Sequence, residues 1–175
     1  MRKLLLHVCC APCSTHAIEI LQKDHDVTLF FYNPNVEPIN EYEKRLQETE
    51  RFAQALGLPL IVGDYDNIDW HSAIQGHEQD KEGGERCSIC FKQRLEKTAM
   101  LAKEKNFDLF TTTLTVSPYK NAEIINKIGK EIAQAVGIEF MESDFKKDNG
   151  YMHSVELSKQ YNLYRQTYCG CLYSK

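Results

Sequence analysis

Five short apolar runs alternate with amphipathic stretches along this chain, and no other feature restricts the fold as much. The runs are rich in β-branched and aromatic side chains, which predicts β-strands, and they cover residues 3–8, 26–33, 58–63, 107–115 and 138–141. Apolar side chains at helical spacing predict helices between them, one starting at an N-cap on Ser14 and the others over residues 38–57, 89–106 and 118–136. This alternation predicts a single α/β domain over residues 1–175.

The same alternation indicates the layers of that domain and the place of its site. We expect a mostly parallel five-stranded sheet between two layers of helices, a three-layer α/β/α domain. In such sheets, functional loops follow the carboxyl ends of the strands. Cys9, Cys10 and Cys13 come directly after the first strand, so we expect a cysteine-rich metal site at this edge. His7, inside the strand, is expected to be a packed, hydrogen-bonded core histidine.

All seven cysteines of the chain lie in three clusters. A single cysteine is usually a small buried hydrophobic residue, but three dense clusters with no isolated cysteine indicate a shared function. The clusters are "CCAPC" (Cys9, Cys10 and Cys13), "CSIC" (Cys87 and Cys90) and "CGC" (Cys169 and Cys171).

The spacing within the clusters suits metal binding or redox chemistry. In "CSIC", a turn would bring both sulfurs to one side, where they could bind one metal or act as a dithiol. Cys9 and Cys10 can reach one centre only if the strand breaks there, which Pro12 favours. Four thiolates from these two clusters fit a closed zinc site or an iron–sulfur cluster, and ligand type alone does not separate the two.

The third cluster favours redox chemistry over a closed zinc site. Cys169 and Cys171 flank Gly170, whose backbone freedom would let the two sulfurs bind a metal or form a strained, easily reduced disulfide. A closed zinc site has no use for two further thiols. Four tyrosines surround this motif in "YNLYRQTYCGCLYS", an unusual composition for a disordered tail.

Composition and charge point to an ordinary soluble protein. With 42% hydrophobic and 26% charged residues and a formal net charge of −4, the chain lacks the excess of basic residues typical of a large non-specific nucleic-acid surface. The N-terminal apolar run is too short for a signal peptide or a membrane span, so we expect a cytoplasmic protein without a membrane partner. In a reducing compartment, clustered cysteines are more often metal ligands or redox catalysts than structural disulfides.

Five motifs in order resemble the QueH-type epoxyqueuosine reductases nearly from end to end. They are "LHVCCAPCS", "FYNPNVEPINEYEKR", "CSICFKQRLEKTAMLA", "FTTTLTVSPYKN" and "LSKQYNLYRQTYCGCLYS". The resemblance implies an oxidoreductase that reduces epoxyqueuosine to queuosine at the wobble position of transfer RNA, without cobalamin, in the last step of queuosine biosynthesis. It also implies a [4Fe-4S] cluster, an external electron donor and an adenine-nucleotide-hydrolase-like topology of the HUP or PP-loop type.

Carried over residue by residue, the resemblance implies roles for the cysteines. The adjacent pair and the Cys-x-x-Cys match the cluster ligands, which are Cys9, Cys10, Cys87 and Cys90. Cys169 and Cys171 match the C-terminal pair, expected either as a redox-active disulfide or as ligands of an additional iron beside the cluster. Cys13 also matches the family motif and is expected only to line the site.

The loop after the first strand differs from that of the wider fold group, and this difference bears on ATP hydrolysis. Related enzymes that activate transfer RNA with ATP carry a glycine-rich loop after the first strand, but "CCAPCST" at this position contains no glycine. A phosphate cradle needs the closely approachable backbone amides that glycines provide. The loop therefore counts against ATP hydrolysis here.

Epoxide reduction also needs a proton donor and contacts to RNA. Asp144, His153 and Tyr119 are candidate proton donors because their side chains can relay protons. Lysines can meet phosphates while an extruded base stacks on a tyrosine, so we expect RNA contacts in "SPYKN", "DFKKDNGY" and the C-terminal segment. The candidate cations are Lys120, Lys146, Lys147 and Arg165.

Two functions of other classes remain open from the residues alone. A zinc-stabilised, non-catalytic RNA-binding module would contain zinc and would not need Cys169 or Cys171. A thiol–disulfide oxidoreductase would act through Cys87 and Cys90, or through the C-terminal pair, without any metal.

Overall fold

The computed structural model describes residues 1–175 and contains one five-stranded sheet in the order β3-β2-β1-β4-β5. All four neighbouring pairs are parallel, which confirms the predicted sheet. The central strand β1 pairs with β2 along its whole length, so both strands end at the same edge. The strands are β1 (Arg2–Val8), β2 (His25–Phe31), β3 (Leu60–Val62), β4 (Leu109–Thr112) and β5 (Glu139–Phe140).

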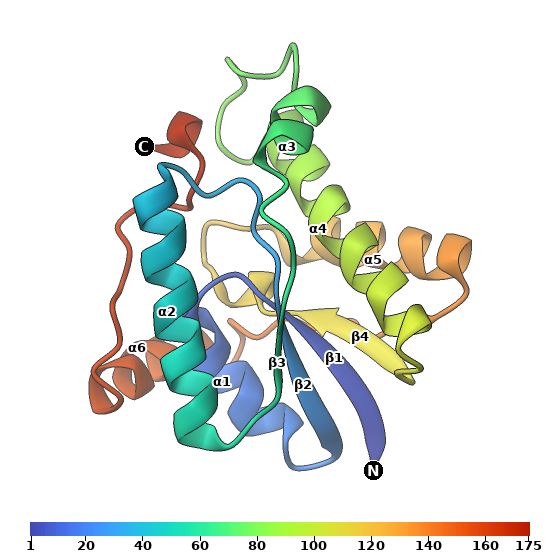
Figure 1. Ribbon diagram of the computed structural model, residues 1–175, viewed down its shortest axis with the longest axis vertical. Helices are drawn as coiled ribbons and strands as arrows, with labels where there is room; N and C mark the ends of the chain where they lie inside the picture. The colour runs from blue at the N-terminus through green and yellow to red at the C-terminus, as the bar shows by residue number, and fades with distance from the viewer.

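Helices cover both faces of the sheet (Figure 1). Helices α1, α2 and α6 lie on one side, where α6 packs along α1, and α4 packs along α5 on the other side. The C-terminal segment returns along α2 to the end of the molecule where α3 lies (Figure 1). The helices are α1 (Ala11–Leu21), α2 (Ile39–Leu56), α3 (Asn67–Ala73), α4 (Glu85–Glu104), α5 (Ala122–Val136) and α6 (Gly150–Gln160), with short 3-10 turns η1 (Leu114–Val116) and η2 (Leu172–Ser174).

Two separate hydrophobic cores fill the spaces between the layers. Successive side chains of a strand point to opposite faces, so Leu4 and Leu6 enter the core under α1 and α2 whereas Leu5 enters the core under α4 and α5. The leucines are fully buried, as expected for a parallel sheet covered on both faces. The three-layer prediction is therefore confirmed.

Some helix ends agree with the sequence prediction, and one does not. Gly57 and Gly137 end α2 and α5 in the left-handed conformation, close to the helix ends predicted at residues 57 and 136. The N-terminus of α1 was predicted wrongly: the helix begins at Ala11 after Cys10, and the Ser14 hydroxyl instead donates to the carbonyl of Ala11. A proline in the first turn does not interrupt a helix, because its missing N–H has no partner there.

Three further helix predictions differ from the structure. Helix α4 begins at Glu85, not at residue 89, so the whole "CSIC" motif lies inside the helix. Helix α5 begins at Ala122, because the Asn121 side chain accepts hydrogen bonds from the amides of Glu123 and Ile124. Helices α3 and α6 were not predicted; the residues that α6 buries are only Gly150, Ser154 and Ser158, which give no apolar periodicity. No helix of the structure has both the length and the apolar character needed to cross a membrane.

Candidate active site

The first cluster of thiols lies where β1 ends. The sulfur atoms of Cys9, Cys10 and Cys13 lie within 4.8 Å of one another, and those of Cys9 and Cys10 are 3.9 Å apart. The strand stops at Val8, the chain bends at Cys9 and α1 begins at Ala11, so the two neighbouring side chains are not forced to opposite faces. The break that Pro12 favours is therefore present.

The three thiols of this cluster ionise unequally. The pKa of Cys9 lies well below its ordinary value, because hydrogen bonds from Cys10 and then from Cys13 stabilise its thiolate and outweigh the effect of burial. The pKa of Cys13 lies well above its ordinary value, because its hydrogen bonds to Cys10 and Cys9 favour the protonated form and burial adds to them. Cys9 is thus the first thiol of the three to become a thiolate.

The second cluster lies on the first turns of α4. Cys87 and Cys90 are three residues apart in a helix, so both side chains lie on one face. The amide of Gly83 donates to the Cys87 sulfur at 3.2 Å, and Cys90 packs with Trp70, Ile74 and the C-terminal Cys171. Burial raises the pKa of both Cys87 and Cys90, so each favours the thiol form until a cation or metal compensates its charge.

The third cluster is fixed to the body of the protein by Arg45 of α2. The buried Arg45 guanidinium donates to the carbonyls of Cys169 at 2.7 Å and Tyr168 at 3.0 Å, and its Nε pairs with Glu41 at 2.9 Å. Gly170 has φ +145°, and a side chain there would collide with Val36 at 2.9 Å. The "CGC" segment is therefore ordered by specific contacts and is not a loose tail.

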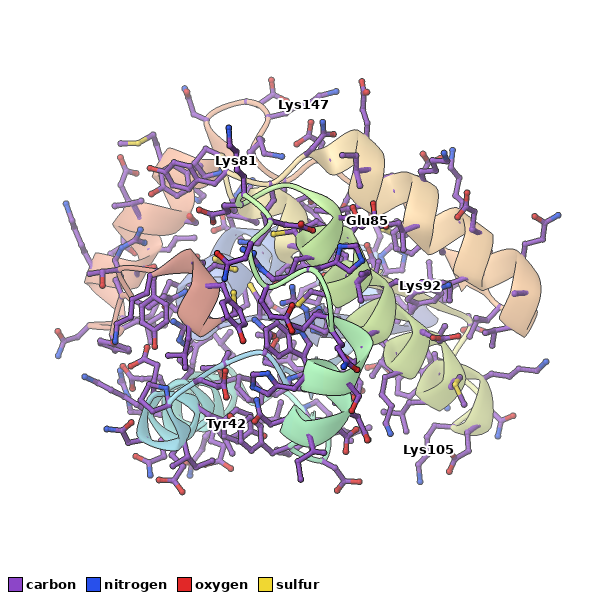
Figure 2. All side chains as sticks on the ribbon, turned by 90° about the horizontal axis from the view of Figure 1, so that it is seen from above. Tyr42, Lys81, Glu85, Lys92, Lys105 and Lys147 are labelled. Atoms are coloured by element: carbon purple, nitrogen blue, oxygen red, sulfur yellow. The ribbon has the colours of Figure 1, made fainter.

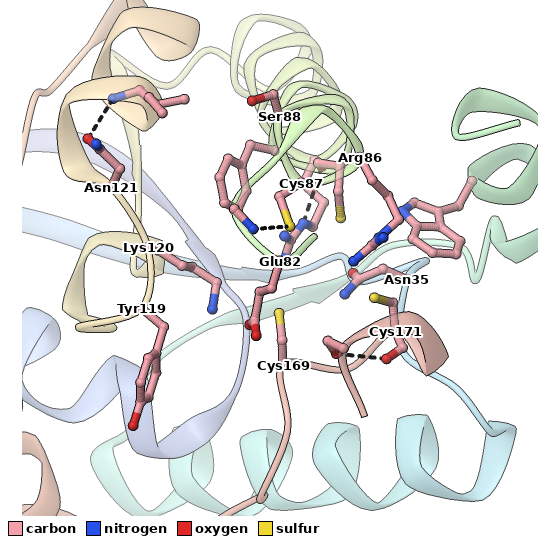
Figure 3. A pocket seen from close by; sticks show the side chains of 17 residues that line it. Asn35, Glu82, Arg86, Cys87, Ser88, Tyr119, Lys120, Asn121, Cys169 and Cys171 are labelled. Carbon is pink, nitrogen blue, oxygen red and sulfur yellow. Dashed lines mark hydrogen bonds between the residues drawn. The ribbon is translucent and has the colours of Figure 1, made fainter. Parts of the chain in front are cut away.

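Two adjoining cavities bring the three clusters together. We call them the α4 cavity, with an empty volume of about 660 Å³, and the β1 cavity, with about 690 Å³. The α4 cavity is lined by cysteines from α4 and the C-terminal segment: Cys87, Cys90, Cys169 and Cys171. The β1 cavity is lined by Cys9 and Cys13, and it shares four residues with the first: Arg94, Tyr119, Lys120 and Cys169. Figure 3 shows Lys120, Glu82 and Cys169 around the α4 cavity.

The predicted ligand set is therefore divided between two sides of the site. Cys9 and Cys10 belong to the group at the end of β1, whereas Cys87 and Cys90 face the α4 cavity. Cys169 lines both cavities and lies between them. All seven cysteines are free thiols, so each one can act as a metal ligand or exchange electrons.

The predicted proton donors and RNA contacts fall into two groups. Tyr119 and Lys120 line both cavities and Arg165 lines the β1 cavity, with Tyr119 79% exposed at the surface. The remaining candidates line neither cavity. Asp144 pairs with Lys146 at 3.1 Å, and His153 contacts Glu19 at 3.0 Å.

Lys147 also lies away from the cavities. It extends from the outer edge of the molecule in Figure 2. His7 is a buried core residue, with its ring nitrogens 2.9 Å from Thr112 Oγ1 and from the carbonyl of Tyr32, which confirms the expectation for this residue.

Three charged residues of the cavities escaped the sequence analysis: Arg86, Arg94 and Glu82. Arg86 is buried and directly precedes Cys87. Arg94 lies one turn after Cys90 on the same face of α4, a position that could have been recognised had the helix been predicted to begin before Cys87. Glu82 is the one acidic residue lining either cavity, and it precedes the Gly83–Gly84 turn that leads into α4. Nothing in its local pattern separates it from an ordinary exposed glutamate.

Solved structures with a similar fold act in transfer-RNA modification, by their names. A predicted subunit of a tRNA methyltransferase from Methanocaldococcus jannaschii matches with a TM-score of 0.63 at 16% identity, covering 89% of this chain and 75% of that one. The U34-tRNA thiolase NcsA from Methanococcus maripaludis, solved with its [4Fe-4S] cluster, matches with a TM-score of 0.61 at 12% identity, covering 99% and 61%. At such identities the likeness establishes the fold alone.

The sequence comparisons are more specific. A protein-family model described as "Epoxyqueuosine reductase QueH" matches residues 4–175. The epoxyqueuosine reductase QueH of Streptococcus pyogenes is 41% identical over 177 residues, which cover 98% of this chain and 69% of that protein. The QueH of Thermotoga maritima is 38% identical, covering 99% of this chain and 91% of that protein. The chain therefore belongs to the family of QueH epoxyqueuosine reductases, which are oxidoreductases.

Proposed function

We propose that this protein reduces epoxyqueuosine to queuosine at the wobble position of transfer RNA, without cobalamin, as the last step of queuosine biosynthesis in the cytoplasm. The observation that carries the proposal is the convergence of six free thiols, from three distant segments, on two adjoining cavities at the carboxyl edge of the sheet, with the seventh, Cys10, 3.9 Å from Cys9. Family membership supplies the reaction, and this edge is where parallel sheets place their sites.

The donor set suits an iron–sulfur cluster. We assign Cys9, Cys10, Cys87 and Cys90 as ligands of a [4Fe-4S] cluster, because thiolates are the usual ligands of such clusters. When bound, a cluster held by four thiolates would supply single electrons, and an additional iron with an open position would supply a Lewis acid. The protein's part is to hold four thiolates in a largely buried place, which requires positive charge nearby. Arg94 and Lys120 provide that charge.

The C-terminal pair has two candidate roles that the geometry supports. Cys169 lines both cavities and Cys171 lies against Cys90 and Trp70, so the pair lies next to the assigned ligands. It acts either as a redox-active disulfide or as ligands of an additional iron. Arg45 holds the segment in place through two carbonyl groups in both cases.

The reaction consumes two electrons and two protons per epoxide and yields an alkene and water. An external donor must therefore deliver two electrons in total. Proton transfer requires a group that reaches the cavities, which Asp144 and His153 do not. Tyr119, already a candidate from the sequence, and Glu82 line the α4 cavity, and we propose these two as the acids.

The β1 cavity is our candidate for the modified base. Tyr119 presents an exposed ring at its edge, and the cavity also contains Tyr151, Tyr168 and Arg165. An extruded base could stack on such a ring while cations meet the flanking phosphates. The surface residues Lys146 and Lys147 lie farther out, where only the RNA backbone would meet them.

Metal analysis of protein purified without oxygen tests this proposal directly. We expect iron with matching acid-labile sulfide, and conversion of epoxyqueuosine to queuosine in transfer RNA once a reductant is added. Zinc without sulfide and without activity would favour the RNA-binding module. Activity that survives complete chelation would favour the metal-free thiol–disulfide oxidoreductase.

A Cys169→Ser variant then distinguishes the two roles of the C-terminal pair. Loss of reduction with iron and sulfide unchanged indicates a redox pair, because the cluster ligands remain. Loss of part of the iron with sulfide unchanged indicates a ligand of an additional iron. Unchanged reduction would exclude both roles. Ser72→Ala, which removes an exposed hydroxyl of α3 outside both cavities, is the control and should remain active.

A further inference from the structure

Arg94 is a buried cation that lacks an acidic partner. Only 2% of the residue is exposed, and its Nε donates to the backbone carbonyl of Cys90 at 3.3 Å. Neither Arg94 nor Lys120 takes part in any of the ion pairs of the structure. A guanidinium remains charged when it is buried, so it needs a compensating negative charge.

The groups that surround Arg94 are thiols. It lines both cavities, and the cysteines nearest in its electrostatic surroundings are Cys90, Cys169 and Cys9. Burial lowers the pKa of Arg94, but the charge that these three cysteines carry when they ionise more than offsets that effect. Glu82, the one carboxylate lining either cavity, is exposed and forms no ion pair with Arg94. The groups beside Arg94 that can carry a compensating negative charge are therefore the thiols.

Lys120 approaches the same thiols from the opposite side. It follows η1 at the end of β4 and lines both cavities, and Figure 3 shows its side chain directed toward the space where Cys169 lies. Burial lowers the pKa of Lys120, but Cys169, Cys9 and Cys13 raise it by more. The lysine is thus a second cation held at the thiols, and it does not extend into solvent as Lys147 does.

We propose that Arg94 and Lys120 are fixed counter-charges that raise the reduction potential of the thiolate-bound cluster. The inference rests on the proposed function, because it requires that a cluster binds here. A one-electron reduction adds one negative charge to the cluster and moves no proton. A buried positive charge nearby stabilises the reduced form more than the oxidised form, so the cluster accepts the electron more easily.

Potentiometric titration of the assembled holoprotein tests this inference, with dithionite as reductant and the spectrum of the reduced cluster as the readout. The variants are Arg94→Gln, Lys120→Gln and the charge-conserving Arg94→Lys. Lys92→Gln is the matched control, because Lys92 lies on the same helix but is exposed and lines neither cavity. We expect both neutral variants to have more negative midpoint potentials, Arg94→Lys to lie near the wild type, and the control to be unchanged.

The outcomes separate this inference from the proposed function. Wild-type protein without iron and sulfide contradicts the proposed function itself. A normal wild-type cluster whose potential is the same in Arg94→Gln and Lys120→Gln contradicts only the counter-charge role. If the Arg94→Gln variant fails to assemble its cluster, the potential of Lys120→Gln decides the question. Lys120 lies on a loop and is half-buried, so replacing it should disturb the fold less. Weakened transfer-RNA binding by Lys120→Gln with an unchanged potential would show a phosphate contact and overturn the inference.

Discussion

The charged side chains at the two ends of the central sheet differ in their exposure and in their partners. At the amino end, Arg2 and Glu139 form an ion pair of 2.6 Å, with side chains 51% and 54% exposed. At the carboxyl end, Arg94 is almost completely buried and no carboxylate pairs with it. Both arginines belong to the same small domain, but water stabilises only the first.

This difference indicates that the charges at the carboxyl end serve the site and do not stabilise the fold. Exposed pairs contribute little to folding and can be replaced at small cost. Buried cations without acidic partners are costly unless another negative group compensates them. At the carboxyl end those groups are thiols, so the charges there are arranged for the site. The predictions below test this contrast, beginning with the largest expected effect.

Replacing Cys90 with serine should have the largest effect, and mainly on activity. The variant loses a proposed cluster ligand and leaves Arg94 with one fewer anionic neighbour. We expect iron content and reductase activity to fall together, with activity lower by about 100-fold or more, since even groups beyond the direct ligands cost about 10–100-fold. Met100→Ser, on the exposed side of α4, is the control. A Cys90→Ser variant with full iron and activity would exclude Cys90 as a ligand.

Arg45→Ala should cause the largest loss of stability. Removing this buried guanidinium leaves Glu41 and two carbonyls of the "CGC" segment without their donor, which costs about 3–5 kcal/mol for a broken buried pair. Chemical unfolding measures this loss, and limited proteolysis should show a released C-terminus. Arg51→Ala is the matched control on α2, because its pair with Glu48 and its hydrogen bonds to the carbonyls of Tyr161 and Asn162 are exposed to water, so their loss should cost only about 1 kcal/mol. Equal losses in both variants would contradict the contrast.

The sequence predicted the sheet but not every helix, for physical reasons. The buried strands consist mainly of apolar residues, so all five could be recognised in the sequence. Helix α6 instead packs through Ser154 and Ser158, and short α3 buries Trp70 alone, so neither has an apolar stripe. Helix starts were shifted where a side chain far from the apolar pattern, such as Asn121, satisfies the first amides.

The site was predicted to a similar extent. The cysteine clusters were sufficient to place the site at the carboxyl edge of the sheet. Cysteine is a rare residue, so several cysteines close together in the sequence indicate a shared role. The proton donors were a different case: Asp144 and His153 were chosen by chemical type, and only the folded chain shows that each contacts a charged surface neighbour outside the cavities. Arg94 and Glu82 were missed because their importance comes from what surrounds them in space.

A smaller effect concerns His7, which lies beneath the site. Burial, and then the charge of Arg94, lower its folded pKa to about 4 from an ordinary value of 6.5. Between these two values the unfolded chain binds more protons, so stability is full above pH 6.5 and falls as the pH decreases toward 4. At pH 5 this difference amounts to about 2 kcal/mol.

Urea unfolding at pH 7 and pH 5 measures the effect of His7. His7→Gln should lose less stability than the wild type over this interval, by roughly the 2 kcal/mol that His7 contributes. Other titrating groups act in both proteins and cancel in the comparison. The same loss in both proteins would mean that His7 is already free to bind a proton in the folded state, contrary to its two buried hydrogen bonds.

The smallest effect is expected at the amino end of the sheet. Arg2→Gln removes the ion pair with Glu139, but both groups remain hydrated, and salt already screens the attraction. The free energy of unfolding at pH 7 should therefore stay within experimental error of the wild type, and the reduction potential should not change. A clear loss of stability would show that exposed charge at this end is structural too. The two ends of the sheet would then not differ in how charge contributes to stability. The thiols alone would no longer explain why the buried cations at the carboxyl end lack acidic partners.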